Sequence, residues 1–116
     1  MKHEEDIIQM RIVQYLEIRK IFCASIPNEA AGKGANKLQI IKKMARLKRM
    51  GLRPGAPDLL VFFPWNEWGF IEVKSKTGTL RKNQKDFRDM CKAKNTPWLL
   101  ARSVSDVALF LEVHNV

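Results

Sequence analysis

Two acidic residues and one lysine have a spacing that can support chemistry. Asp58 directly precedes the apolar run 59–63, and Glu72 and Lys74 lie at the end of a second apolar run, 70–74. The short segment 64–69 between the runs begins with a proline and predicts an antiparallel hairpin. Because side chains alternate along a strand, Glu72 and Lys74 share one face about 6.6 Å apart, and the hairpin can bring Glu72 beside Asp58.

Such a cluster favours metal-assisted chemistry. Two neighbouring carboxylates repel each other unless a divalent cation lies between them, and Mg²⁺ prefers oxygen ligands. A metal lowers the pKa of its bound water and polarises a phosphoryl oxygen, and Lys74 can then orient the nucleophile or stabilise the developing charge. These are the parts of a phosphodiesterase. The alternative is a solvent-facing strand on which Glu72 and Lys74 form a weak ion pair; Asp58 at hairpin distance favours the catalytic interpretation.

Two strings around these residues resemble a known nuclease family. RLKRMGLRPGAPDLLVF and GFIEVKSKTGTLRKNQ are similar to the PD-(D/E)xK nuclease superfamily, and more closely to its VRR-NUC branch in the stand-alone bacterial or phage form. The resemblance implies Mg²⁺ as cofactor, with Mn²⁺ able to substitute. It implies five catalytic residues: Asp58, Glu72, Lys74, Glu5 and Gln84. It implies four metal ligands: Asp58, Glu72, the main-chain carbonyl of Val73, and Glu5.

Glu5 and Gln84 each have an ordinary structural explanation as well. Family members carry a Glu four residues before a Gln on the first helix, and Glu5 and Gln9 match this spacing. Acidic residues in the first turn of a helix are also stabilised by the positive end of the helix dipole, which is the structural explanation. The neighbouring Glu4 is an alternative for the residue that reaches the metal. Gln84 follows a Gly-x-Leu sequence, as it does near the family's active site, but glutamine is also a good helix former.

The basic residues are concentrated ahead of the proposed metal site. The formal net charge is +9, and the segment 30–57 contains eight bases and no acid. Seven of the bases are predicted to contact DNA: Lys33, Lys37, Lys42, Lys43, Arg46, Arg49 and Arg53. The alternative is that they form only a solvated helix face.

Length and composition limit the possible classes of protein. A chain of 116 residues is expected to form a single domain, 1–116. No apolar stretch approaches the roughly 18 residues that span a bilayer, so we expect no membrane association. The acidic start lacks a signal-peptide pattern and predicts a cytoplasmic protein of a bacterium or a phage-infected cell. Cys23 and Cys91 have no zinc-type spacing and are expected to be buried free thiols.

The pattern of elements predicts an α/β fold with a small mixed sheet flanked by helices, as in the restriction-endonuclease-like PD-(D/E)xK core. Helices are expected at 4–22, 37–50 and 81–94, and a last one ends near Val113 with Ser103 as its N-cap. Extended segments are expected at 23–26, 59–63, 70–74 and 98–101. The run 59–63 is predicted to be buried on both faces. Ile40, Met44 and Leu47 are predicted to line a buried stripe of the second helix.

The resulting expectation is a Mg²⁺-dependent endonuclease that acts in DNA repair on branched DNA such as four-way (Holliday) junctions, as a homodimer. A nickase or flap nuclease of the same chemistry is one alternative. A non-catalytic, basic nucleic-acid-binding module is the other. Trp65 and Trp68 are candidates for an interface or for stacking on an unpaired base, or else they form a small core under the hairpin turn.

Overall fold

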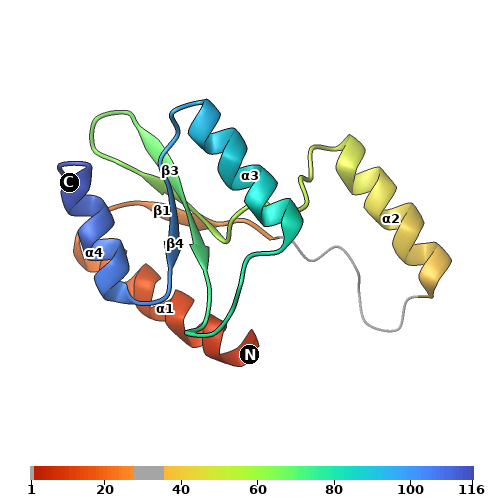
Figure 1. Ribbon diagram of the computed structural model, residues 1–116, viewed down its shortest axis with the longest axis horizontal. Helices are drawn as coiled ribbons and strands as arrows, with labels where there is room; N and C mark the ends of the chain where they lie inside the picture. Colours follow the sequence, from red (N-terminus) through yellow and green to blue (C-terminus); the bar gives the residue numbers. More distant parts are fainter. Residues whose placement is uncertain (1, 28–35) are drawn as a thin grey trace.

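The computed structural model describes residues 2–27 and 36–116, which form four helices and four strands. Figure 1 shows the sheet between helices, with one further helix standing to the side. In chain order, the elements are α1 (Lys2–Ile18), β1 (Cys23–Ser25), α2 (Lys37–Arg49), β2 (Leu59–Phe62), β3 (Trp68–Val73), α3 (Lys82–Ala93), β4 (Trp98–Ala101) and α4 (Val104–Val113).

The four strands form one mixed sheet in the order β1-β2-β3-β4. Strands β1, β2 and β3 pair antiparallel, and β4 lies parallel to β3 after the crossover through α3. The predicted α/β fold with a mixed sheet and the predicted antiparallel hairpin are therefore confirmed. Since β2 runs opposite to β3 and β4, its first residue lies at the edge of the sheet where β3 and β4 end.

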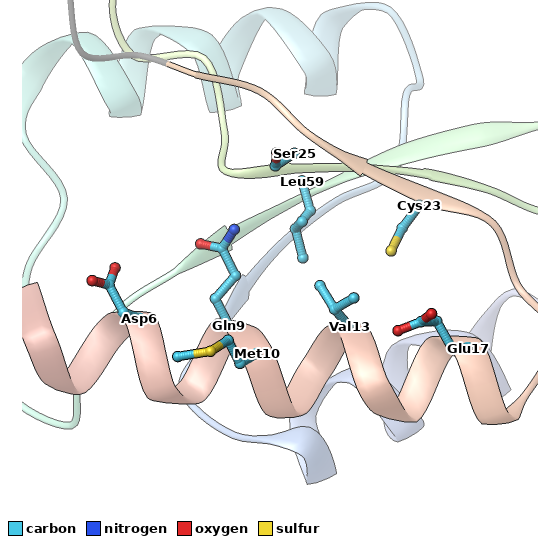
Figure 2. Close-up of a pocket in the computed structure, with 8 residues that line it drawn as sticks. All are labelled: Asp6, Gln9, Met10, Val13, Glu17, Cys23, Ser25 and Leu59. Atoms are coloured by element: carbon cyan, nitrogen blue, oxygen red, sulfur yellow. The ribbon is translucent and has the colours of Figure 1, made fainter.

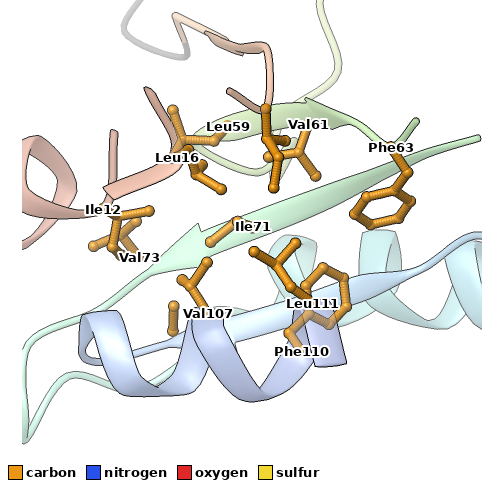
Figure 3. Packing of buried hydrophobic residues seen from close by; sticks show 12 residues of the cluster. Ile12, Leu16, Leu59, Val61, Phe63, Ile71, Val73, Val107, Phe110 and Leu111 are labelled. Carbon is orange, nitrogen blue, oxygen red and sulfur yellow. The ribbon is translucent and has the colours of Figure 1, made fainter. Parts of the chain in front are cut away.

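The main core lies between this sheet and helices α1 and α4. The inward-facing residues of β2 and β3 alternate with outward-facing ones, as the period of a strand requires. Figure 3 shows the residues packing between the sheet and the two helices. Those with almost no exposed surface are Ile12, Leu16, Leu59, Val61, Ile71, Val73, Ala101, Val107 and Leu111.

The opposite face of the sheet is covered only in part. Phe70 of β3 packs edge-on against Phe87 of α3, with their ring centroids 5.2 Å apart. Helix α3 packs on β4 and does not extend over the far end of β2, where Phe62 is 42% exposed. The prediction that 59–63 is buried on both faces was therefore wrong, because no helix among the described residues covers β2 on this side.

Helix α1 ends four residues before its predicted end. The chain leaves the helix through Lys20, whose φ is +60°, and the Ile21 N–H then donates to the Leu16 carbonyl at 2.9 Å. This reversal buries Ile21 and lets β1 pair with β2. The apolar pattern continues past Ile18, so the pattern by itself could not show where the helix stops.

Helix α2 begins at the predicted residue and ends one residue before its predicted end, but it does not have the predicted packing. A capping box formed by Asn36 and Gln39 fixes its start. Basic residues in its last turn interact favourably with the negative end of the helix dipole. In the described part of the chain, α2 packs against no other helix or strand, and it contains no buried residue. Ile40, Met44 and Leu47 are only half-buried, so the predicted buried stripe was wrong.

Both cysteines are free thiols, as predicted, although only Cys91 is buried and Cys23 is half-buried. None of the helices among the described residues is long and apolar enough to cross a membrane.

Candidate active site

Asp58 and Glu72 face each other across the β2–β3 hairpin. The register pairs Leu59 with Ile71, so that one step further along the hairpin Asp58 is opposite Glu72. The Asp58 carboxylate accepts a hydrogen bond of 2.7 Å from the Val73 N–H, which holds the acid against the end of β3. The same hairpin that the sequence predicts therefore brings the two carboxylates together.

Lys74 and Gln84 complete the cluster around Glu72. The Lys74 ammonium lies 4.0 Å from Glu72 Oε2, and Lys74 is itself buried. Gln84, in the first turn of α3, donates from Nε2 to Glu72 Oε2 at 3.4 Å. Its Oε1 accepts from the Arg81 N–H at 2.9 Å, which fixes the orientation of the amide group. Gln84 is thus more than a helix former, because its side chain links α3 to the acid on β3.

The electrostatics of the cluster is dominated by the burial of Glu72, which is 3% exposed. Burial raises the pKa of Glu72 to about 8, and the charge of Asp58, a hydrogen bond with Asp58 and the charge of Glu5 act in the same direction. Lys74 opposes these effects without cancelling them. The cluster therefore carries an excess of acid that a bound cation would neutralise.

Of the two glutamates at the start of α1, Glu5 and not Glu4 reaches this cluster. Glu5 is half-buried and lines the same pocket as Asp58 and Glu72, whereas Glu4 is exposed. Gln9, one turn further along α1, lines the pocket as well, as the four-residue spacing predicts. Glu5 also lies in the first turn of its helix, so its position satisfies the dipole explanation at the same time.

The pocket has a volume of about 600 Å³ and contains all five predicted catalytic side chains. Four residues that the sequence analysis did not propose for the site also line it: Asp6, Ile26, Thr79 and Arg81. Arg81 could have been found from its position three residues before Gln84 in the lead-in to α3. The lining residues are Glu5, Asp6, Gln9, Ile26, Asp58, Glu72, Lys74, Thr79, Arg81 and Gln84.

The donor set of the pocket fits Mg²⁺. Within residues 2–27 and 36–116, no three His, Cys, Asp or Glu side chains form a ready cluster of metal ligands. A pair of carboxylates is sufficient for this ion, since Mg²⁺ usually keeps several waters and takes one or two carboxylates together with substrate phosphate. Asp58 and Glu72 form such a pair. Glu5 and the Val73 carbonyl remain predicted ligands.

A second cavity, shown in Figure 2, lies beside the active-site pocket and shares Asp6 and Gln9 with it. It has a volume of about 660 Å³ and lies between α1 and β1. Val13 points from α1 toward Leu59 within this cavity, and the acids Asp6 and Glu17 stand along it. Because Asp6 lines both cavities, the second cavity is continuous in charge with the acidic side of the active-site pocket.

Six of the seven predicted DNA-binding residues are among those that the structure describes, and they lie on and just after α2 and do not line the pocket. Four of them line a shallow concavity on the helix surface: Lys42, Lys43, Arg46 and Arg49. Lys37 is exposed at the start of α2, and Arg53 follows the helix and donates to the carbonyls of Lys48 (3.3 Å) and Leu52 (3.2 Å). Lys33 lies outside the described residues. The basic segment is next to Asp58 in sequence, but α2 itself stands apart from the sheet (Figure 1).

The loop that connects α2 to Asp58 is fixed against α3. Residues 55–57 are buried, and Gly55 has a φ of +87°. A Cβ at Gly55 would lie 2.3 Å from the Asn83 carbonyl oxygen and 2.9 Å from the Gln84 nitrogen, so only glycine allows this approach. The loop therefore rests on the turn of α3 that carries Gln84.

The fold and the site together define a protein class. A mixed sheet flanked by helices, with two acids and a lysine placed by its central hairpin, is an α/β core of the PD-(D/E)xK type. The chain belongs to the VRR-NUC family, whose domain model matches residues 3–105. The resemblance inferred from the two sequence strings is thereby confirmed. Membership makes the chain a nuclease domain with DNA as its substrate.

Solved structures support the same fold. A structure described as "VRR_NUC domain" is similar, with a TM-score of 0.65 and 19% identity over 94% of this chain and 95% of that chain. Another, described as "VRR_NUC domain protein", has a TM-score of 0.69 and 19% identity over 94% of this chain and 85% of that chain. A search of curated proteins gave no match. At this identity, the two structures establish the fold alone.

Proposed function

We propose that the protein is a Mg²⁺-dependent endonuclease that hydrolyses phosphodiester bonds in DNA. The observation that carries this proposal is the meeting of Asp58, Glu72 and Lys74 in one pocket. Asp58 and Glu72 would hold the metal, and Glu5 and the Val73 carbonyl would complete its protein ligands. The raised pKa of Glu72 supports the proposal. It shows that the negative charge of Glu72 is unfavourable in the pocket by itself, and a bound cation would stabilise that charge.

The residues around the pocket have distinct proposed roles. When bound, Mg²⁺ supplies an acidified water and polarises the phosphoryl oxygen. Lys74, 4.0 Å from Glu72 Oε2, is positioned to orient the attacking water or to offset the negative charge that builds up on the phosphate. Gln84 holds the Glu72 carboxylate in place through its amide. Arg81 lines the pocket and is a candidate to bind a neighbouring phosphate.

We propose branched DNA, such as a four-way (Holliday) junction, as the preferred substrate, and DNA repair as the process. The bases of α2 and the catalytic pocket lie in separate parts of the molecule. A substrate with arms in several directions can contact both parts at once.

We also propose that the working form is a homodimer. A two-fold enzyme suits a four-way junction, because two equivalent pockets can cut symmetry-related strands. Support comes from exposed apolar side chains on α2 and around the hairpin, which include Leu38, Ile41, Phe22, Phe62, Trp65 and Trp68.

A nickase or flap nuclease with the same chemistry is the nearest alternative, and a monomer that cuts one strand would favour it. A basic binding module without catalysis is the alternative from another class. The partly buried, hydrogen-bonded arrangement of Asp58, Glu72 and Gln84 disfavours that module, since acids of a solvated surface need no such partners.

The proposal is tested by incubating the purified protein with labelled duplex, flap, splayed-arm and four-way-junction DNAs. Each DNA is combined with Mg²⁺, with Mn²⁺ and with a chelator. We expect cleavage with either metal, none with chelator, and the fastest cleavage on the junction. Binding without cleavage under every condition would support the binding module, and preferential cutting of the flap would replace the proposed substrate.

A further inference from the structure

Arg102 links the end of β4 to the turn that follows the catalytic lysine. Strands β3 and β4 are parallel, so Lys74 and Arg102 leave the sheet at the same edge, and the Lys74 N–H donates to the Ala101 carbonyl at 3.0 Å. Arg102 then reaches across this edge. Its Nη1 donates to the main-chain carbonyls of Ser75 and of Gly78, the latter at 2.8 Å.

The turn 75–78 is closed on itself as well as by Arg102. The Gly78 N–H donates to the Ser75 carbonyl at 3.2 Å and to the Ser75 hydroxyl at 3.1 Å. Ser75 is only 1% exposed, so its carbonyl depends on partners within the protein. Both ends of the turn therefore accept from one guanidinium nitrogen, and the shape of the turn depends on it.

The inner side of this turn lies against two proposed catalytic residues. A Cβ at Gly78 would be 3.3 Å from Glu5 Oε2 and 3.4 Å from Lys74 Cδ. The turn thus contacts the acid that comes from α1 and the side chain of the lysine that follows β3. A shift of the turn would move both groups relative to Asp58 and Glu72.

Arg102 is itself held by the start of α4. The main-chain N–H of Arg102 donates to Asp106 Oδ2 at 2.8 Å, and the main-chain N–H of Asp106 donates to the N-cap hydroxyl of Ser103 at 3.3 Å. The planar guanidinium has donors in fixed directions, which suits it to hold two carbonyls at once. A rigid path therefore runs from the capped start of α4 through Arg102 to the turn.

We propose that Arg102 is a positioning residue for DNA cleavage. It holds the turn 75–78 so that the Lys74 ammonium and the Glu5 carboxylate point into the pocket beside Asp58 and Glu72. This inference rests on the proposed nuclease function. Arg102 does not line the pocket, so it acts through the turn and not on the DNA.

The first test compares Arg102→Gln with the wild type on junction DNA. We expect kcat to fall about tenfold to a hundredfold, since small displacements of catalytic groups have effects of this size. KM for DNA should stay within twofold, and the Mn²⁺ affinity measured by calorimetry should weaken because Glu5 is displaced. Hydrogen exchange at the Gly78 amide should be faster. Arg102→Lys, which keeps a donor, should recover part of kcat.

Arg19→Gln is the matched control. Arg19 also donates to a main-chain carbonyl, that of Val116 at 3.0 Å, but it lies outside the pocket. This control should leave kcat and Mn²⁺ affinity unchanged. Equal losses in the two glutamine variants would mean that only general stability had changed, and would overturn the inference. A raised KM with unchanged kcat would also overturn it, because Arg102 would then contact DNA.

Gly78→Ala gives an independent test that keeps Arg102. The added methyl would meet Ser75 Oγ, Glu5 Oε2 and Lys74 Cδ at 3.2–3.4 Å and should lower kcat and Mn²⁺ affinity in the same way. This variant decides the matter if Arg102→Gln does not fold, and wild-type values in it would then overturn the inference. If the wild type itself does not cleave, the proposed function fails, and the Mn²⁺ affinity and amide exchange of the variants still decide the role of Arg102.

Discussion

Glu72 and Asp58 illustrate how a folded chain can hold two acids side by side when one of them keeps its proton more readily than a free carboxylic acid. The backbone places them opposite each other, the Val73 N–H stabilises Asp58, and Gln84 donates to Glu72. Lys74 is too far from Glu72 for a close ion pair, at 4.0 Å. The outcome is a pKa of about 8 for Glu72, where the ordinary value is 4.5.

The first prediction concerns the pH dependence of stability without metal. Because the folded state raises the pKa of Glu72, protonated Glu72 favours folding below about pH 4.5, and this contribution is lost as the pH rises to about 8. The free energy of unfolding should therefore fall in this range, by up to about 1.4 kcal/mol per pH unit. Chemical denaturation at several pH values with chelator measures it. In Glu72→Gln the slope should be smaller, and an unchanged slope would assign the titration to other groups.

The second prediction concerns the three central side chains. Asp58→Asn, Glu72→Gln and Lys74→Ala should each lower the cleavage rate at least about a hundredfold, because each removes a charge that acts on the transition state. The first two should also weaken Mn²⁺ binding in calorimetry, whereas all three should keep most of their affinity for DNA. Glu67→Gln, an exposed acid in the hairpin turn, is the control and should cleave normally. Wild-type cleavage by any folded variant would remove that residue from the mechanism.

At the scale of elements, helix α2 and the loop after it behave differently. The helix packs against no other element of the described chain, but its connecting loop is buried at residues 55–57 and rests on α3. A helix whose basic side chains project into solvent is suited to contact phosphates. The buried loop at residues 55–57 fixes the segment that leads from this helix to Asp58.

The third prediction tests the basic face of α2. Replacing Lys42, Lys43, Arg46 and Arg49 by glutamine should weaken binding to DNA of every shape. The dependence of log affinity on log salt should flatten by about 0.9 for each phosphate that the protein no longer neutralises. Titrations at several salt concentrations measure this slope. As a control for total charge, the same change is made at four exposed bases elsewhere, Arg11, Lys20, Lys92 and Lys94, which should leave the slope nearly unchanged. Equal slopes for the two quadruple variants would show that DNA lies elsewhere.

The fourth prediction tests the loop between α2 and Asp58. Gly55→Ala should destabilise the protein by about 2–4 kcal/mol, since it combines a strained φ with a clash against the Asn83 carbonyl. Gly51→Ala is the matched control, because Gly51 also has a positive φ but has nothing within 4 Å of the added methyl. It should cost only about 1 kcal/mol. Similar losses in the two variants, measured by denaturation, would mean that the loop does not press on α3.

At the scale of the whole molecule, the apolar surface is unevenly distributed. Trp65 and Trp68 are 62% and 52% exposed, so the interpretation of a small core beneath the hairpin turn was wrong. Phe22 and Phe62, also exposed, form a tilted pair with ring centroids 5.5 Å apart. Exposed aromatic residues gathered around one hairpin are typical of an interface or of a surface on which bases stack.

The fifth prediction concerns assembly. Light scattering with size-exclusion chromatography should give a species of twice the 13.4 kDa chain mass. Trp65→Ala or Trp68→Ala should convert it to the single chain if the hairpin forms the interface. Leu109→Ala, which alters an exposed apolar residue on α4, is the control. A species of single-chain mass, both free and on junction DNA, would contradict the dimer. A dimer that persists in both tryptophan variants would exclude Trp65 and Trp68 from the interface and favour their stacking on unpaired bases.

The sequence by itself determined the catalytic hairpin. Alternation along residues 70–74 put Glu72 and Lys74 on one face, and the short turn allowed Asp58 to lie beside Glu72, as the observed register confirms. The N-cap of α4 at Ser103 is equally local, since it depends on residues within one turn. The basic character of segment 30–57 also followed directly from composition.

Only the tertiary structure decided how the elements are covered and joined. The stripe of Ile40, Met44 and Leu47 predicts burial but cannot name a partner, and α2 has none in the described chain. The choice between Glu4 and Glu5 depended on the rotation of α1 against the sheet. The contact of Arg102 with the turn after Lys74 joins residues 24 and 27 positions apart, and it arises from the parallel pairing of β3 and β4. Such contacts have no local signal, because a parallel crossover brings together residues that no sequence period relates.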